Sequence, residues 1–193
     1  MGTLFILSGP SGVGKNTVAE RLLAEVGENL KKIVTTTTRK PRSGEKNGID
    51  YNFISTEEFE KKVRNSEFLE YAKVHGDDYY GSPLADTLAV LSSGYDALLL
   101  IDTSGVEQIL GRRNDFRIAT IFLAPKNLED LGQRIINRGT ETEEEISKRL
   151  KTAENEIKKS QIYDHIVVSK SRDDDFAAVF EIYSHLTRKK HPP

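Results

Sequence analysis

A glycine-rich segment near the amino terminus constrains the fold more than any other feature of the chain. Residues 9–16 read GPSGVGKN and fit the pattern G-x-x-x-x-G-K-[ST] at every fixed position except the last, where Asn16 stands. An apolar run at 4–7 precedes this segment, and apolar residues at helical spacing follow it over 17–26. A strand, a glycine loop and a helix in this order surround a polyphosphate with backbone N–H groups and a helix N-terminus. The pattern predicts a nucleoside triphosphate site, with Lys15 supplying positive charge to the β- and γ-phosphates.

The composition narrows the class of protein. The 193 residues suffice for one domain with a sizeable core, and their net charge of −2 indicates no general attraction to nucleic acid. There is no cysteine, which excludes disulfides, thiolate zinc sites and thiol nucleophiles. The apolar run at the amino terminus is too short for a signal peptide, and no stretch reaches membrane-spanning length. We therefore expect a cytoplasmic protein with neither a nucleic-acid nor a membrane partner.

Apolar runs alternate with amphipathic segments along the chain. Strand-like runs occur at 4–8, 97–101, 118–124 and 165–168. Helical patterns occur around 17–26, 83–93, 104–111, 127–138 and 173–187. This alternation predicts an α/β fold of three layers, with a parallel central sheet covered by helices on both faces, as in P-loop nucleotide-binding proteins.

Two stretches interrupt the alternation. Residues 33–82 are rich in Thr, Arg, Gly and Tyr and contain short alternating runs, which predict a small antiparallel insertion. Within it, Ser55 and Glu58 form a capping box that predicts a helix near 56–65. Residues 138–160 are highly charged and have a helical pattern.

A second candidate site lies in the 33–82 stretch. Arg39 and Arg42 stand three residues apart, with hydroxyl residues before them and Tyr51 after them. Guanidinium groups bind phosphate oxygens through paired hydrogen bonds, and a phenol can donate another. The spacing is compatible with a phosphate site and equally with a solvated basic loop.

Six motifs together resemble the guanylate kinase family in order and spacing, and they cover nearly the whole chain. They are Gly9-Pro-Ser-Gly-Val-Gly-Lys, Thr37-Thr38-Arg39-x-Pro41-Arg42-x-Gly44-Glu45, Gly48-x-Asp50-Tyr51-x-Phe53, Glu67-Phe68-x-Glu70, Tyr79-Tyr80-Gly81-Ser82 and Arg138-Gly139-Thr140-Glu141-Thr142. The resemblance implies one domain with a core of residues 1–32, 83–125 and 161–193, a GMP-binding insertion at 33–82 and a helical lid at 126–160.

The resemblance also implies which residues bind GMP. Four match the family's positions for the GMP phosphate, namely Arg39, Arg42, Tyr51 and Tyr80. Four match positions around the guanine, namely Thr35, Glu70, Ser82 and Asp102. Guanine presents two donors, N1–H and the exocyclic amine, that one carboxylate such as Glu70 can accept together. Adenine presents an acceptor at N1 instead, so this carboxylate would favour guanine. Without the neighbouring motifs, Glu70 would be interpreted as an exposed strand carboxylate.

The remaining implied roles concern ATP. The matching ATP-binding residues are Gly9, Pro10, Ser11, Gly12, Val13, Gly14, Lys15, Asn16, Thr17 and Arg134. The matching catalytic residues are Lys15, Arg39, Arg138 and Arg149, with Mg²⁺ as the cofactor of ATP. The implied lid contains Arg134, Arg138 and Arg149; the alternative for each of them is surface ion pairing with the glutamates nearby.

The chain departs from the family pattern at several positions. Asn16 replaces a serine whose hydroxyl binds Mg²⁺, and its amide oxygen is a candidate metal ligand. Leu100 and Ser104 stand where the family usually has Asp and Gln, and Ser169-Lys170 stand where it tends to have Asn-Asp. The guanine side therefore resembles the family more closely than the metal and adenine side does.

We expect ATP-dependent phosphorylation of GMP to GDP, with a lowered rate as one consequence of these departures. Two alternatives are a related small-molecule kinase, acting for example on ribose 1,5-bisphosphate, and a binding module that uses the GMP face to hold partner proteins. The complete GMP set argues against the first, and the retention of Lys15, Arg138 and Arg149 argues against the second. The motifs leave open whether dGMP is an acceptor and whether the protein is a monomer or a homo-oligomer.

Overall fold

The computed structural model describes residues 1–74, 77–115, 117–136 and 143–188. The chain forms two compact units. Unit 1 comprises Met1–Ile6 and Glu28–Ala119, and unit 2 comprises Leu7–Gly27 and Thr120–Pro193.

The larger sheet has five strands in the order β2-β7-β1-β8-β9. They are β1 (Thr3–Ser8), β2 (Leu30–Lys32), β7 (Asp96–Leu100), β8 (Arg117–Ala124) and β9 (His165–Val168). The pairs β2–β7 and β8–β9 are parallel. All six residues of β1 are buried, which explains why an uninterrupted apolar run marks this strand. The predicted α/β class with a parallel central sheet is confirmed.

Unit 1 also holds a four-stranded sheet in the order β4-β3-β6-β5. Its strands are β3 (Thr36–Thr37), β4 (Asn52–Phe53), β5 (Phe68–Val74) and β6 (Asp78–Pro83), and its helices are α2 (Thr56–Arg64), α3 (Leu84–Ser92) and α4 (Thr103–Leu110). Phe59 of α2 anchors the helix, because its fully buried ring stacks on Phe68 at 4.4 Å and on Tyr79 at 5.2 Å between centroids. The expectation of an antiparallel insertion needs one correction: β3 and β4 pair in parallel, so the sheet is mixed.

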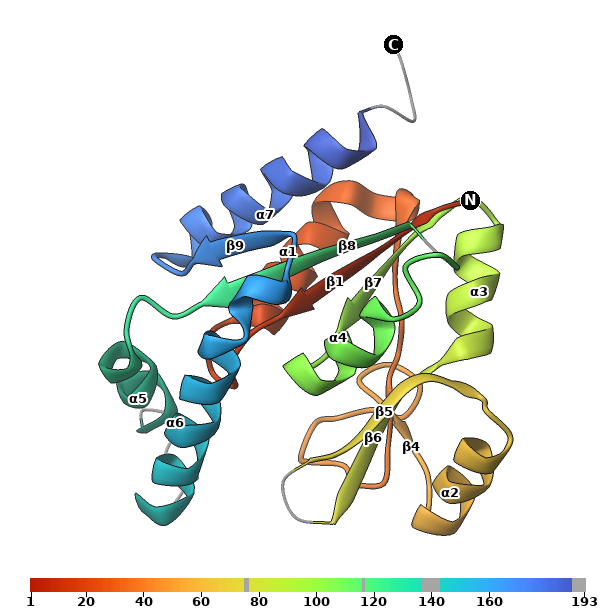
Figure 1. Ribbon diagram of the computed structural model, residues 1–193, viewed down its shortest axis with the longest axis horizontal. Coiled ribbons are helices and arrows are strands. Elements are labelled where there is room, and N and C mark those ends of the chain that lie inside the picture. The colour runs from red at the N-terminus through yellow and green to blue at the C-terminus, as the bar shows by residue number, and fades with distance from the viewer. Residues whose placement is uncertain (75–76, 116, 137–142, 189–193) are drawn as a thin grey trace. The chain divides into compact units, whose positions relative to one another are not determined.

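Unit 2 contains α1 (Lys15–Val26), α5 (Leu128–Ile136), α6 (Glu143–Lys158) and α7 (Arg172–Thr187), and a short 3₁₀ turn, η2 (Ser160–Ile162). A second such turn, η1 (Gly27–Asn29), follows α1. Helix α1 packs on α7, where Arg21 pairs with Asp173 at 2.7 Å and lies over the ring of Phe176. Helices α5 and α6 lie side by side (Figure 1), with Gly132 facing Leu150.

The expected helices form close to their expected bounds. The Ser55 hydroxyl accepts a hydrogen bond from the Glu58 amide at 3.1 Å, as the capping box predicts for α2. The charged segment expected over 138–160 is helical over Glu143–Lys158, and residues 137–142 lie outside the described ranges. No helix in the described ranges is long and apolar enough to cross a membrane.

Candidate functional site

The glycine-rich loop of unit 2 exposes backbone groups at the start of α1. Gly9, Gly12 and Gly14 have φ values of 141°, 92° and 118°, which side chains of L-residues rarely allow. Gly9 also lies against the backbone of Leu123, where a Cβ atom would collide with the carbonyl oxygen. Gly14 is the N-cap of α1, and no side chain caps the helix there. The first-turn N–H groups thus suit an anion, as the motif predicts.

The Lys15 side chain is folded onto this loop. Its Nζ donates hydrogen bonds to the carbonyl oxygens of Gly9 and, at 3.1 Å, of Pro10. The ammonium group is therefore held beside the loop by backbone groups of unit 2. A phosphate bound in the loop would lie close to this positive charge, which the backbone hydrogen bonds already hold in place.

Two arginines from α5 and α6 contact the same loop. Arg149 donates from Nη1 to the Ser11 hydroxyl at 2.9 Å. Arg134 donates from Nη1 to the Val13 carbonyl at 3.0 Å. Its guanidinium also reaches the Ser169 hydroxyl at 3.3 Å and the Lys170 carbonyl at 3.4 Å. Arg134 therefore links the loop to the segment after β9, a contact that the sequence did not indicate.

The remaining residues considered for this site lie in the first turn of α1, in the segment after β9 or outside the described ranges. Asn16 is exposed and Thr17 is half-buried in the first turn of α1. Ser169, one of the departures from the family pattern, is buried and donates to Asp175 at 2.6 Å, so it has a structural role. Arg138 lies outside the described residues.

The donor atoms near the loop fit a metal held largely by its substrate. Across the ranges that the structure describes, no three His, Cys, Asp or Glu residues gather as metal ligands. Mg²⁺ keeps several water ligands and binds substrate phosphates together with one or two protein oxygens. The exposed amide oxygen of Asn16, next to Lys15, is compatible with such a site.

Arg39 of unit 1 forms the centre of a polar cluster. Its Nη1 and Nη2 donate to the two carboxylate oxygens of Glu45, each at 2.9 Å. Nη1 also donates to the Lys40 carbonyl at 2.7 Å, and Nε donates to the Tyr80 hydroxyl at 3.1 Å. The hydrogen bonds between the two side chains raise the pKa of Arg39 and lower the pKa of Glu45. A guanidinium has five N–H groups, and these contacts use four.

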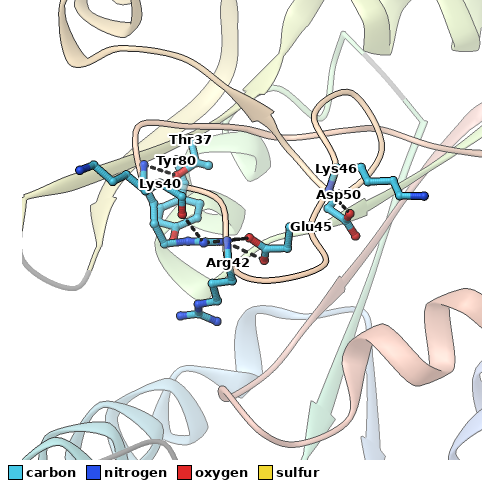
Figure 2. A network of polar contacts seen from close by, with 8 residues as sticks. Thr37, Lys40, Arg42, Glu45, Lys46, Asp50 and Tyr80 are labelled. Atoms are coloured by element: carbon cyan, nitrogen blue, oxygen red, sulfur yellow. Dashed lines mark hydrogen bonds and ion pairs between the residues drawn. The ribbon is translucent and has the colours of Figure 1, made fainter.

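Arg42 differs from Arg39 in its environment. Its backbone N–H donates to Glu45 Oε2 at 2.7 Å, but its guanidinium is exposed and points away from that carboxylate (Figure 2). Among the described residues, the Arg42 guanidinium makes no hydrogen bond or ion pair. Glu45 thus connects both arginines, although sequence reasoning did not assign it to the site. Its presence in the same motif, six residues after Arg39, was the available signal.

Two tyrosines border this cluster. The rings of Tyr51 and Tyr80 meet edge to face, with centroids 5.9 Å apart. The Arg39 guanidinium lies 5.4 Å from the Tyr51 ring centroid. Burial raises the pKa of the Tyr51 hydroxyl, so this phenol stays protonated and can donate a hydrogen bond. The structure therefore brings together the four residues predicted for the GMP phosphate.

Glu70 and Ser82 form a second, buried pair in unit 1. They stand opposite each other on β5 and β6, and the Ser82 hydroxyl donates to Glu70 Oε1 at 2.5 Å. Burial, and secondarily the negative charge of Asp102, raise the pKa of Glu70 to about 7, against the lowering effect of the Ser82 hydrogen bond. Asp102 caps α4 by accepting a hydrogen bond from the Gly105 amide at 3.0 Å. In its ionised form this buried carboxylate would accept hydrogen bonds from the donors of a ligand, which would offset the cost of burying its charge.

Thr35 is the least constrained of the predicted guanine residues. It precedes β3, and its carbonyl accepts a hydrogen bond from the Asn52 amide at 2.8 Å. Its hydroxyl makes no hydrogen bond within the described part of the chain. Of the two departures in this unit, Leu100 is half-buried at the end of β7 and Ser104 is exposed in α4.

The fold and the loop define a class of protein. A strand, a glycine loop with its lysine and a helix, set in a parallel sheet, make this a P-loop nucleotide-binding protein. The family model for guanylate kinase matches residues 1–186. The chain belongs to the guanylate kinase family.

Individual relatives agree with this assignment. A guanylate kinase of Rickettsia prowazekii is 43% identical over 176 residues, which cover 91% of this chain and 85% of that protein. One of Clostridioides difficile is 45% identical over 166 residues, covering 86% and 79%. The crystal structure of guanylate kinase from Anaplasma phagocytophilum matches with a TM-score of 0.76 at 31% identity, covering 100% of this chain and 87% of that one.

Proposed function

We propose that the protein transfers the γ-phosphoryl group of ATP to GMP, which gives ADP and GDP. The observation that carries the proposal is the buried Glu70 carboxylate of unit 1, hydrogen-bonded to Ser82 and close to Asp102. Membership in the guanylate kinase family supports it independently.

Guanine recognition follows from the chemistry of this carboxylate. When ionised, Glu70 only accepts hydrogen bonds, and guanine offers two neighbouring donors, N1–H and the exocyclic amine. Adenine would place an acceptor against it, which leaves buried polar atoms unpaired. Ser82, Asp102 and Thr35 complete the proposed guanine site. We expect dGMP to be an acceptor as well, because none of these contacts involves the ribose.

The GMP phosphate would bind at the arginine cluster. The Arg42 guanidinium would donate hydrogen bonds to the phosphate. Arg39 is held by Glu45 and would contribute the one N–H group that its present hydrogen bonds do not use. The hydroxyls of Tyr51 and Tyr80 add further donors.

ATP would bind through the loop of unit 2. Residues 9–17 would hold the phosphates, with the Lys15 ammonium at the β- and γ-phosphates. Arg134 would act on ATP through the loop that it supports, and Arg138 and Arg149 would contact the transferring phosphoryl group. Asn16 would supply a protein ligand to Mg²⁺, which when bound with ATP would neutralise phosphate charge.

The chemical step requires little of the protein beyond positioning. The attacking oxygen belongs to a GMP phosphate that is already anionic, so no general base is needed. Catalysis would come from in-line alignment of the two nucleotides and from positive charge around the γ-phosphoryl group. We assign the GMP-binding insertion to 33–82, the lid to 126–160 and the core to the rest of the domain, and expect lid closure to exclude water.

The test is ADP release from ATP and Mg²⁺ with GMP, AMP, CMP or UMP as the acceptor, beside a Lys15→Ala variant. GMP-dependent turnover that the variant lacks is the expected result. Turnover with another acceptor in preference to GMP would overturn the proposal. GMP binding without transfer to any acceptor would indicate a binding module instead.

A further inference from the structure

The strand that carries Glu70 lies at an edge of its sheet. β5 is the last strand in the order β4-β3-β6-β5, so every second residue turns its backbone N–H and C=O away from β6. The register is also irregular between Phe68 and Glu70, which weakens the ladder next to the carboxylate. Pairing with β6 alone therefore leaves the position of Glu70 incompletely fixed.

A side chain of α4 takes the place of the missing neighbouring strand. Gln108 Nε2 donates to the carbonyl oxygen of Tyr71 at 2.8 Å, and Gln108 Oε1 accepts from the Tyr71 amide at 3.3 Å. One carboxamide thus satisfies both outward backbone groups of the residue that directly follows Glu70. These contacts resemble the hydrogen bonds of a strand pair at a single residue.

A glycine one turn earlier in α4 faces the carboxylate itself. Gly105 is buried in the first turn, and its φ does not lie in the left-handed region, so the backbone there does not require glycine. Glycine destabilises a helix relative to alanine. However, a Cβ atom at this position would lie 2.6 Å from Glu70 Oε2 and 3.0 Å from Glu70 Cδ, closer than packing allows. The space that a methyl group would fill is occupied by the Glu70 carboxylate.

We propose that α4 sets the guanine specificity of the protein: Gly105 leaves room for the Glu70 carboxylate, and Gln108 fixes the strand that carries it. Both are positioning residues, and the inference rests on the proposed role of Glu70 as the guanine-binding group. The carboxylate is then bounded on both oxygens, by Ser82 at Oε1 and by Gly105 at Oε2. A methyl group at position 105 would move the end of the Glu70 side chain and leave the helix intact.

The experiment compares Gly105→Ala with Gly111→Ala. Gly111 caps the same helix at its C-terminus with a φ of −62°, and a Cβ there would meet only ordinary contact at 3.5 Å. The readout is the ratio of kcat/KM for GMP to that for IMP, which lacks the exocyclic amine. The KM for ATP and the melting temperature are measured for each variant.

Gly105→Ala should lower the GMP-to-IMP ratio about tenfold or more. A displaced carboxylate no longer accepts a hydrogen bond from the exocyclic amine, which GMP has and IMP lacks. The KM for ATP should stay unchanged, and the melting temperature should fall by no more than a few degrees, because the added methyl group displaces the end of one buried side chain. Gly111→Ala should behave as the wild type in all three measurements. A loss of activity caused by general destabilisation would lower turnover of GMP and IMP alike and leave the ratio where it was.

Gln108→Met tests the second contact, because methionine keeps the length of the side chain and removes the carboxamide. We expect the KM for GMP to rise about fivefold to tenfold, with a smaller change in kcat. If Gly105→Ala does not fold, the GMP-to-IMP ratio of Gln108→Met tests the proposed role of α4 in its place, and a lowered ratio supports that role.

A wild-type ratio in folded Gly105→Ala, or in folded Gln108→Met, would overturn the role proposed for that residue. A wild-type protein that does not phosphorylate GMP would instead refute the proposed function. In that case calorimetric binding of GMP and IMP to the same variants still measures what α4 contributes.

Discussion

The two units use different chemistry for the two nucleotides that we assign to them. In unit 2, the glycine loop offers mainly backbone N–H groups, and even Lys15 is held by backbone carbonyls. In unit 1, the candidate site consists of side chains that are already hydrogen-bonded to one another, as in the Arg39–Glu45 and Glu70–Ser82 pairs. Backbone recognition depends on loop shape and tolerates changes of side chain, whereas side-chain recognition does not. On this assignment, a loop that binds phosphates through its backbone tolerates Asn16 where the family usually has serine, while the guanine set is complete.

The largest effect should come from the single charged side chain of the loop. Lys15→Ala removes the ammonium group that would stabilise the transferring phosphoryl charge, and we expect kcat to fall about 10²- to 10³-fold. Steady-state ADP release measures the change, with Arg188→Ala, an exposed cation of the same unit outside the proposed lid, as the control. If Lys15→Ala retained wild-type kcat, the ATP site would have to lie elsewhere.

In unit 1, we expect a substitution of Glu70 to change the kinetics of GMP strongly and those of ATP not at all. Glu70→Gln replaces an acceptor of two hydrogen bonds by an amide that can accept only one of them well, and kcat/KM for GMP should fall about 10²-fold. The KM for ATP should not change. Glu60→Gln, an exposed carboxylate of α2, is the matched control. A parallel rise in the KM for ATP would contradict the assignment of Glu70 to guanine alone.

The raised pKa of Glu70 predicts a pH dependence. Only the ionised carboxylate accepts both guanine donors, and its pKa is about 7, so the KM for GMP should rise as the pH falls below 7. Well below the pKa, the rise should approach about tenfold per pH unit. Glu70→Gln, measured over the same range, subtracts the ionisation of the GMP phosphate itself. A wild-type KM that follows the Gln variant at every pH would contradict the prediction.

The same shift has a consequence for stability. Between the ordinary pKa of 4.5 and about 7, the folded protein binds the Glu70 proton more tightly than the unfolded chain does. The contribution of Glu70 to the free energy of unfolding therefore falls as the pH rises through this window.

A smaller effect is expected from the exposed arginine of the phosphate cluster. The Arg42 guanidinium has no partner among the described residues, so its donors remain available to a phosphate. Arg42→Ala should raise the KM for GMP about tenfold to a hundredfold, the value of a few charge-assisted hydrogen bonds. Calorimetric binding of guanosine, which lacks the phosphate, should be unchanged, and Arg64→Ala serves as the control. Equal losses for GMP and guanosine would place Arg42 outside the phosphate site.

The sequence predicted the elements of the fold well because most of them have a buried apolar face. Strand β2 was missed, since only Leu30 of its three residues is buried and two lysines follow. The parallel β3–β4 pair was missed because two-residue strands have no periodicity to detect.

The contacts around the candidate site were harder to predict. Gln108 meets Tyr71 across 37 residues of sequence, and Arg134 meets Val13 across 121. Such pairs depend on the tertiary fold, and no local pattern contains them. The residue types of the site could be read from motifs, whereas the support of Glu70 by α4 required the structure.

The smallest effect concerns the departure at the end of the loop. Asn16→Ser restores the hydroxyl of the usual pattern, and we expect kcat to change by less than about threefold, because the proposed Mg²⁺ would be held mostly by water and by phosphate oxygens. Calorimetric binding of ATP without metal should be unchanged, since backbone N–H groups of the loop carry that interaction. A rise in kcat of about thirtyfold or more, near the value of one strong charge-assisted contact, would mean that Asn16 impairs the metal site. In that case the loop would tolerate a changed side chain only in binding the phosphates. Metal binding in unit 2 would then depend on a particular side chain, as the proposed guanine recognition in unit 1 does.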